Sequence, residues 1–177
     1  MMPPPGRVRL RLLAATVAAI GLGACNGPPT RLRADDRPSA SIPTDAEVAD
    51  RVAKVIDLHN DERASRKLPT LEVSPRLTRA AQRHADDMAR RKVMAHKGGD
   101  GSSPFDRIEA TGYLYRRAGE NVAYGRFTPE RVMKGWMDSP PHRRNVLGSF
   151  SQIGVACAIA EDGTSYWCAT FGLPMRP

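Results

Sequence analysis

Three polar stretches contain the side chains in this chain that are best suited to chemistry. A carboxylate, Glu120, lies between Gly119 and Asn121, just before an apolar stretch. His59 falls within an earlier helical pattern, and His142 follows a later one. Imidazoles and a carboxylate are the usual groups for general acid–base chemistry and for binding zinc. We therefore predict that His59, Glu120 and His142, far apart in the sequence, converge on one cleft.

Two neutral imidazoles and a carboxylate would give a zinc ion three protein ligands and leave its fourth position open to water. Zinc-activated water, with Glu120 as its base, would then support hydrolysis. Each residue also has a structural alternative. His59 lies on an apolar stripe and could be a histidine of the core. Glu120 could have a structural role in which it accepts hydrogen bonds from the N–H groups of a tight turn. His142 could cap nearby backbone.

Other polar residues near these stretches are expected to have supporting roles. His84 shares a helix face with alanines and a methionine, so we expect it to pack in the core or between helices. His96 lies at a helix end, where it would stabilise the helix as a cation or reach the rim of the cleft. Asn60, Arg63 and Asn121 are predicted to form a hydrogen-bonding scaffold. The sequence has no Gly-x-Ser-x-Gly motif that would supply a nucleophile.

The first 24 residues have the pattern of an export signal. Three arginines precede an apolar run that is too short to span a bilayer comfortably. The stretch Leu22-Gly23-Ala24-Cys25 resembles the bacterial lipobox, in which cleavage leaves Cys25 as a lipidated first residue. The alternative is a plain signal peptide cut nearby, with Cys25 incidental. We expect an exported, extracytoplasmic protein that is lipid-anchored to a bacterial cell membrane, the outer membrane if the cell has one.

Residues 25–43 are predicted to be a flexible tether, because prolines and charged residues dominate them and little is available to bury. The chain has a formal net charge of +8, and three of its positive charges lie in the leader. The remaining excess suits an acidic surface such as cell-wall polymer or lipid headgroups, or serves solubility alone. No run of Lys or Arg is interleaved with aromatic residues, so nucleic acid is not an expected partner.

Residues 44–177 have the length of one globular domain. Capping residues and helical spacing predict four helices: from Thr44 to about Lys67, from Ser74 through Met88, from Ser103 through Ile108, and from Thr128 to Ser139. One further helical turn is expected from His142 to Leu147. Apolar stretches at 119–125, 153–159 and 166–171 predict strands. The arrangement favours an α+β fold in which helices cover one antiparallel sheet.

The last two strands flank Asp162-Gly163, a dipeptide typical of hairpin turns. If these two residues form the centre of the turn, Cys157 and Cys168 are cross-strand neighbours on one face. Their Cβ atoms would lie roughly 4.5–5.5 Å apart, which suits a disulfide. Export supplies an oxidising compartment. We therefore predict a Cys157–Cys168 disulfide, with two buried thiols as the alternative.

Several of these motifs occur together and in order. They are His59-Asn60-x-x-Arg63, Met94-Ala95-His96, Asp100-Gly101, Asp106-Arg107, Gly119-Glu120-Asn121, Trp136-Met137-x-Ser139-Pro140-x-His142-Arg143-x-Asn145, Ile153-Gly154-Val155, Tyr166-Trp167 and Phe171-Gly172. This pattern, from about residue 48 to residue 173, resembles the bacterial branch of the CAP superfamily (SCP/PR-1-like domains). The resemblance implies that residues 44–177 form a three-layer α-β-α sandwich with a cleft.

In animal and plant members of that family the cleft holds two histidines and two acids, and the histidine pair can bind zinc. Carried over to this chain, the resemblance makes His59 the first histidine, Glu120 the first acid and His142 the second histidine. The family's Trp-x-x-Glu pattern ends here in Ser139, so the second acid is missing. Asp138 is adjacent, but one step along a helix turns a side chain by about 100°.

Family members have been linked to apolar ligands, including sterols and lipids, and to roles in the cell envelope. The resemblance therefore implies a lipid-anchored, extracytoplasmic module that binds a lipid or cell-wall ligand at the His/Glu cleft. One alternative is a metal-dependent hydrolase that acts on peptide or cell-wall material at the same cleft. Another is a structural or interaction domain with a vestigial cleft, which agrees with the missing acid.

Overall fold

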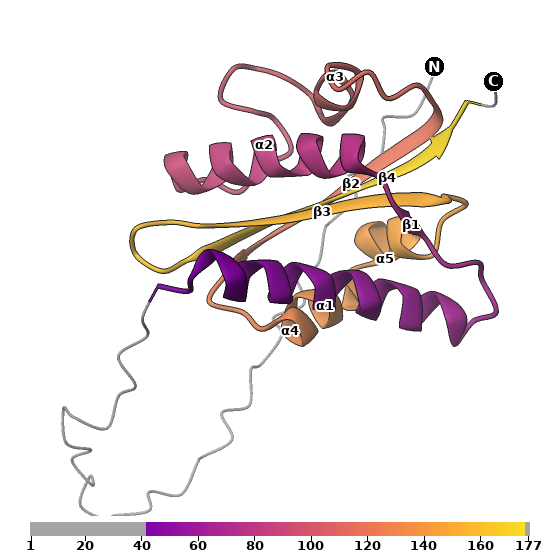
Figure 1. Cartoon of the computed structure of the whole chain (residues 1–177), viewed down its shortest axis with the longest axis horizontal. Coiled ribbons are helices and arrows are strands. Elements are labelled where there is room, and N and C mark those ends of the chain that lie inside the picture. The colour runs from indigo at the N-terminus through magenta and orange to yellow at the C-terminus, as the bar shows by residue number, and fades with distance from the viewer. Residues whose placement is uncertain (1–41, 176–177) are drawn as a thin grey trace, which may run out of the picture. The chain divides into compact units, whose positions relative to one another are not determined.

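A computed structural model describes residues 42–175 of the chain. One sheet lies between two layers of helices (Figure 1). The elements are α1 (Asp45–Ala64), β1 (Glu72–Val73), α2 (Pro75–Arg91), α3 (Pro104–Glu109), β2 (Tyr115–Gly125), α4 (Pro129–Asp138), α5 (Pro140–Val146), β3 (Gln152–Ile159) and β4 (Ser165–Pro174). The predicted α+β sandwich is confirmed. The predicted leader, the lipobox at Cys25 and nearly all of the tether lie outside the described residues.

The sheet has four strands in the order β1-β3-β4-β2. β4 pairs antiparallel with β3, as the hairpin pattern predicted, and it also pairs antiparallel with β2. β1 pairs parallel with β3 over two residues, so the sheet is mixed rather than wholly antiparallel. This strand lies between α1 and α2 in the sequence. It is too short to show an alternating pattern, so the sequence did not predict it. Strand β2, which carries Glu120, forms one edge of the sheet.

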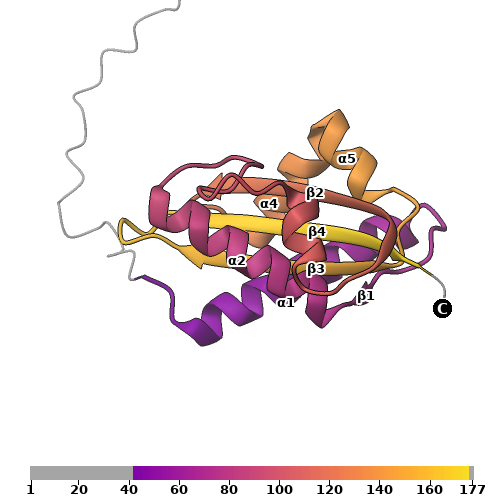
Figure 2. The same cartoon turned by 90° about the horizontal axis from the view of Figure 1, so that it is seen from above.

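Helices α2 and α3 cover one face of the sheet, and α1, α4 and α5 lie on the other side (Figures 1 and 2). Helix α2 approaches β3 closely, as its alanines predicted, with Ala81 and Ala85 fully buried. A Cβ atom added at Gly154 of β3 would lie 2.1 Å from the backbone nitrogen of Thr78. The helix can lie this close only because Gly154 has no side chain.

Two consecutive prolines start α5 rather than separating it from α4. Pro140 and Pro141 occupy its first turn, directly after the cap residue Ser139. Proline is tolerated there because the first N–H groups of a helix have no intrahelical partner. The helix therefore begins two residues earlier than the expected turn at His142. None of the helices within residues 42–175 is long and apolar enough to cross a membrane.

A buried guanidinium ties α1 to the chain that follows α5. Arg63 is only 2% exposed. Its nitrogens donate to the carbonyl oxygens of Pro69 at 2.7 Å, Val146 at 2.9 Å, Gly148 at 2.8 Å and Phe150 at 3.2 Å. Val146 ends α5, and the other three carbonyls belong to loop backbone. Arg63 therefore has the scaffolding role expected for it.

The predicted disulfide is wrong. Cys157 pairs across the hairpin with Trp167, and Cys168 pairs with Ala156. Both cysteines are free and buried, and they belong to core clusters on opposite faces of the sheet. The last β3–β4 pair is Ile159 with Ser165, so the turn is longer than two residues. A one-residue change of register sends every side chain to the other face, which separates the two thiols.

We expect Arg63→Met to lower the free energy of unfolding by about 3 kcal/mol or more. The substitution keeps most of the buried volume but leaves buried carbonyl oxygens without donors. Arg66→Met is the matched control, since Arg66 is on the same helix and its exposed ion pair with Glu62 contributes about 0–1 kcal/mol. Chemical denaturation of both variants measures the difference. Equal, small effects would contradict the scaffolding role.

Candidate functional site

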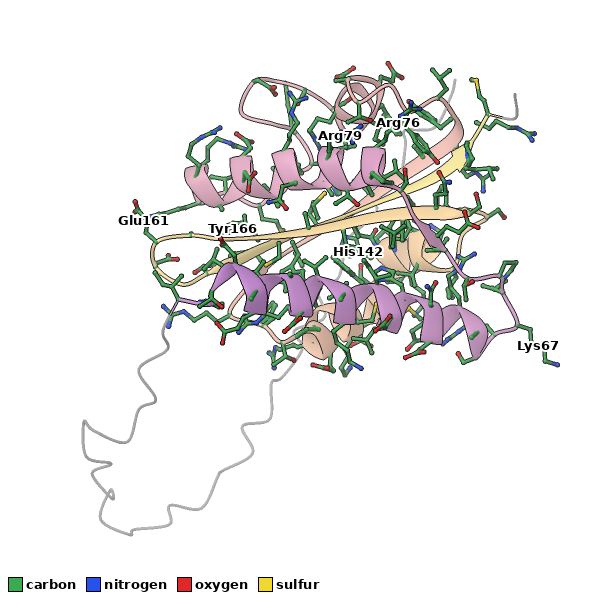
Figure 3. All side chains as sticks on the ribbon, in the orientation of Figure 1. Lys67, Arg76, Arg79, His142, Glu161 and Tyr166 are labelled. Carbon is green, nitrogen blue, oxygen red and sulfur yellow. The ribbon has the colours of Figure 1, made fainter. Side chains whose placement is uncertain are left out.

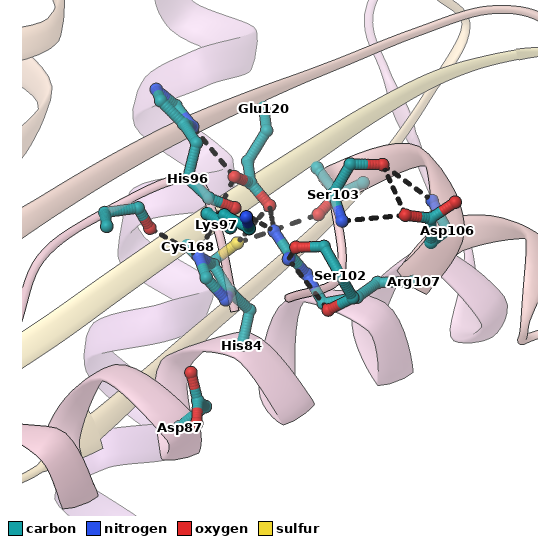
Figure 4. A network of polar contacts seen from close by, with 12 residues as sticks. His84, Asp87, His96, Lys97, Ser102, Ser103, Asp106, Arg107, Glu120 and Cys168 are labelled. Atoms are coloured by element: carbon teal, nitrogen blue, oxygen red, sulfur yellow. Dashed lines mark hydrogen bonds and ion pairs between the residues drawn. The ribbon is translucent and has the colours of Figure 1, made fainter. Parts of the chain in front are cut away.

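Glu120 is the centre of a polar network on the α2 side of the sheet (Figure 4). It is 8% exposed. Its Oε1 accepts a hydrogen bond from His96 Nδ1 at 2.9 Å, and its Oε2 accepts one from Arg107 Nη2 at 2.8 Å. The Cys168 thiol also donates to Oε2, at 3.5 Å. A buried carboxylate is stable here because both of its oxygens are paired with donors.

Arg107 and His96 are positioned by the connection between α2 and α3. Ser103 and Asp106 form a reciprocal capping box that fixes the start of α3, so the next residue, Arg107, projects back toward the sheet. Its Nη1 donates to the carbonyl of Ser102 at 3.0 Å, and its Nη2 also donates to the carbonyl of His96 at 2.9 Å. The same guanidinium therefore holds the backbone of His96 and the carboxylate that His96 contacts.

The charges of the network favour an ionised Glu120 and a protonated His96. Burial alone would raise the pKa of Glu120, but the hydrogen bond from His96 and the charge of Arg107 outweigh it and hold that pKa below its ordinary value. The hydrogen bond to Glu120 raises the pKa of His96, against a smaller opposing effect of burial. His96 thus remains a cation at pH values where an ordinary histidine is neutral.

His84 lies beside the network but is not its charge partner. Its Nε2–H donates to the carbonyl of Ala95 at 2.7 Å and is 3.8 Å from Glu120 Oε1. Burial lowers the pKa of His84 more than the charge of Glu120 raises it. The ring is therefore neutral, and its approach to Glu120 is not an ion pair. Its fully buried position matches the expected packing role.

His142 is held at the β2 edge through the backbone of α5. Its carbonyl accepts from Asn121 Nδ2 at 3.0 Å, and Asn145 Nδ2 donates to Glu120 O at 3.1 Å and to Asn121 Oδ1 at 2.8 Å. A Cβ at Gly119 would lie 3.0 Å from the Asn145 amide oxygen, so the glycine makes room for this contact. The His142 side chain is partly exposed, and burial and the charge of His96 lower its pKa.

His59 does not join Glu120 and His142, and the predicted convergence of these three residues is wrong. His59 is fully buried on the opposite face of the sheet, among the large side chains of α4 and β4. Its Nδ1 donates to the Val55 carbonyl at 2.7 Å, and its ring centroid lies 5.4 Å from that of Trp136 and 5.6 Å from that of Phe171. Burial lowers its pKa to about 4. The structure thus places it as a neutral core histidine.

The predicted zinc set of His59, Glu120 and His142 does not fit this geometry. The sheet separates His59 from Glu120, and both oxygens of Glu120 are already hydrogen-bonded to Arg107 and His96. Within residues 42–175 no group of three or more His, Cys, Asp or Glu side chains is placed to bind a metal ion. No hydrolytic step through zinc-activated water follows from these residues.

Sequence reasoning missed Arg107 and gave His96 only an alternative place at the cleft rim. Both residues belong to short motifs of the resemblance, Met94-Ala95-His96 and Asp106-Arg107, which are the signals that point to them. Neither shows a periodicity that predicts contact with Glu120, because His96 lies in the loop after α2 and Arg107 lies in the six-residue helix α3.

Comparison with known proteins identifies the family. Residues 56–171 match CAP, the cysteine-rich secretory protein family. The chain belongs to this family. It is 39% identical over 119 residues to the Bacillus subtilis protein YkwD, covering 67% of this chain and 45% of YkwD. It is 30% identical over 103 residues to the membrane protein YlbC of the same species, covering 58% of this chain and 30% of YlbC. The CAP chain thus spans less than half the length of either relative.

Solved structures share the fold of this CAP protein. An outer surface protein of Borrelia burgdorferi superposes with a TM-score of 0.67 at 20% identity, covering 71% of this chain and 94% of the Borrelia chain. An extracellular SCP-domain protein of Bacillus anthracis gives a TM-score of 0.65 at 24% identity, covering 73% of this chain and 44% of the Bacillus chain. At these identities the likeness concerns the fold alone.

We expect Glu120→Gln to lower the pKa of His96 toward its ordinary value of 6.5, because the substitution removes the negative charge that stabilises the imidazolium. NMR titration of the His96 ring measures this pKa. In the wild type, the stability that the His96 charge contributes is complete below pH 6.5 and disappears as the pH rises through the raised pKa. An unchanged His96 pKa in the variant would show that Glu120 does not govern it.

Proposed function

We propose that this CAP protein is an extracytoplasmic binding module whose ligand contacts His96 and His142 beside Glu120. The observation that carries the proposal is the state of His96. One ring nitrogen is fixed on a buried carboxylate, while the side chain remains 54% exposed. An imidazole held in this way presents its second nitrogen to solvent in a set orientation, which lowers the entropic cost of binding.

The chemistry of the site favours binding over hydrolysis. A general base needs an oxygen that the substrate can reach and a pKa near the working pH. Glu120 has neither, since its side chain is only 3% exposed and its pKa is lowered by the hydrogen bond from His96 and the charge of Arg107. The protonated His96 instead offers an N–H donor and a positive charge. The neutral His142, close enough for the charge of His96 to affect its pKa, adds a second imidazole.

The ligand group that suits this pair is an oxyanion, either a phosphate of a lipid headgroup or an acidic group of cell-wall polymer. A cationic donor forms its strongest hydrogen bonds with such oxygens. The two sources agree with an exported protein held at a membrane. The leader pattern and the lipobox at Cys25 support that setting, as does the likeness to an outer surface protein and an extracellular protein.

The ligand test compares two probes on the full chain carrying Cys25→Ser: phosphatidylglycerol vesicles and purified cell-wall sacculi. We expect saturable binding to one of them that weakens about 10-fold in His96→Gln, the range for losing a hydrogen bond with a charged group. Binding should also weaken as the pH rises through the pKa of His96. Lys97→Gln is the control, because it removes a neighbouring exposed charge and leaves the Glu120 contact intact. Binding that His96→Gln leaves unchanged, or no binding to either probe, would favour a vestigial cleft.

The membrane anchor is tested separately by fractionating bacterial cells. We expect the wild-type protein in the membrane fraction and Cys25→Ser in the soluble extracytoplasmic fraction or in an unprocessed form, because the substitution removes the sulfur that would be acylated. Metabolic labelling with a fatty acid should mark the wild type alone. A correctly processed Cys25→Ser protein that stayed in the membrane fraction would contradict lipidation at this residue.

A further inference from the structure

A groove lies at the start of α2, at the end of the sheet where β3 begins and β4 ends. Its volume is about 590 Å³, and its lining includes Arg76, Arg79, Tyr113, Leu114 and Met175. None of these residues belongs to the candidate site around Glu120. The groove is therefore a separate surface, and its two walls differ in chemistry.

One wall of the groove is apolar and open to solvent. Leu114, just before β2, is 69% exposed, and Met175, just after β4, is 55% exposed. The N–H of Met175 donates to the carbonyl of Leu114 at 3.0 Å, which keeps the two residues side by side. Phe105 of α3 is 47% exposed, and its ring stacks on that of Tyr115, the residue after Leu114. Three exposed apolar side chains thus gather at this end of the sheet, and covering them would be favourable.

The other wall of the groove is basic. Arg76 and Arg79 are exposed side chains at the start of α2 (Figure 3). Neither guanidinium forms an ion pair with another residue of the range 42–175. No Asp or Glu is among the described residues that line the groove. The two positive charges are therefore not neutralised locally.

Helix α2 adds to the positive potential of the groove. The N-terminus of a helix carries a partial positive charge, which acidic residues stabilise and basic residues oppose. Helices α1, α3 and α4 each have an acidic residue in the first turn, whereas α2 has none and has Arg76 there. Arg76 Nη1 also donates to the carbonyl of Gly112 at 3.1 Å, which holds its charge beside the apolar wall. An anionic partner would relieve this unfavourable arrangement.

The floor of the groove is packed and fixed. Tyr113 is 4% exposed, and its hydroxyl donates to Gln152 Oε1 at 2.8 Å. A Cβ atom added at Gly172 of β4 would lie 2.4 Å from the hydroxyl oxygen of Tyr113, so this ring lies directly on the strand. The backbone positions of both walls are therefore set before a partner arrives, which favours binding.

The combination of the two walls favours an anionic lipid bilayer as the partner. Basic side chains bind anionic headgroups, while apolar side chains beside them enter the boundary with the acyl chains. An acidic cell-wall polymer would pair with the arginines but would gain nothing from the exposed apolar side chains. A neutral apolar partner would bury two guanidinium groups without counter-charges, which is costly. A bilayer also needs no matching shape, so a few side chains suffice.

We propose that this end of the domain is a docking surface for an anionic lipid bilayer, formed by Arg76, Arg79, Phe105, Leu114 and Met175. The arginines contact headgroup phosphates, and the three apolar side chains enter the acyl boundary. So few groups give weak, reversible binding, which orients the domain on the membrane rather than anchoring it. The docking surface requires neither acylation of the leader cysteine nor a ligand at the candidate site.

The test is co-sedimentation of the full chain carrying Cys25→Ser with vesicles of phosphatidylcholine, with and without phosphatidylglycerol. We expect stronger binding to the anionic vesicles, and this binding should weaken as the salt concentration rises. Equal binding to both kinds of vesicle, or binding to neither, would overturn the proposal. Purified sacculi are the third probe, and binding to sacculi without binding to vesicles would also overturn it.

Charge variants locate the binding. Arg76→Gln combined with Arg79→Gln should weaken binding to the anionic vesicles about 25-fold, because each basic side chain near such a surface contributes roughly a fivefold factor. Lys54→Gln combined with Arg144→Gln is the matched control, since it removes two exposed positive charges from the layer of helices on the other side of the sheet. An equal loss in both double variants would show that net charge alone matters and would contradict the docking surface.

Two further measurements keep the result unambiguous. Arg79→Gln alone should weaken binding about fivefold, and Arg79 forms no hydrogen bond within the described range 42–175, so this variant replaces the pair if that is unstable. The effect of the arginine pair should be the same in the His96→Gln background. Failure of the proposed contact at His96 and failure of the docking surface are thereby told apart.

An apolar variant tests insertion. We expect Leu114→Ser to weaken binding to the anionic vesicles about 10-fold, because it removes most of an apolar side chain that would leave water. Val93→Ser is the matched control. Val93 is 45% exposed, but it follows the other end of α2, a helix of 17 residues and therefore about 25 Å long. Equal effects of the two substitutions would contradict insertion at the groove.

Discussion

The surrounding structure depends on one requirement, which is to stabilise the buried charge of the Glu120 carboxylate. An ionised carboxylate that is only 8% exposed is costly unless it is paired and hydrogen-bonded. Arg107 and His96 supply that pairing, and both come from the irregular connection around α3. This connection must therefore fold back over the edge strand β2. Its position is decided less by its own sequence pattern than by the charge that it neutralises.

The sheet divides the chemistry of the molecule into two compartments. On the α1 and α4 side, His59 is a neutral aromatic packing group between Trp136 and Phe171. On the α2 side, Glu120 and His84 belong to a polar cluster beneath the helix. The same division keeps Cys157 and Cys168 apart. Alternation of side chains along strands enforces it, because neighbours in the sequence point to opposite faces.

Positions in both compartments are fixed mainly by side chains that bond to backbone. Arg63 holds the chain after α5, and Asn121 and Asn145 hold α5 against β2. These bonds orient His142 without using its ring, and the ring remains available to solvent. A pre-oriented polar surface of this kind suits recognition. Glu120 is poorly placed to act as a base, because its carboxylate is buried and paired with Arg107 and His96.

The sequence by itself determined most of the fold. Capping boxes, helix-starting prolines and apolar periodicity located the helices. The alanines of α2 predicted its close packing, and the ordered motifs indicated the family. These features are local, so neighbouring residues suffice to define them. Glu120 and His142 were predicted as site residues from the ordered motifs, and Arg63 and Asn121 were predicted as scaffold.

Tertiary structure alone decided which face each side chain occupies and which distant groups meet. The pairing of the two cysteines depended on the length of one turn, and a single residue of register reversed it. The placement of His59 on an apolar stripe allowed both a core and a cleft location, and the packing of α1 on α4 chose the core. The contacts of Arg107 and His96 with Glu120 depend on the path that the chain between α2 and β2 takes across the sheet. That path follows from burying a charge, a long-range requirement that no local pattern encodes.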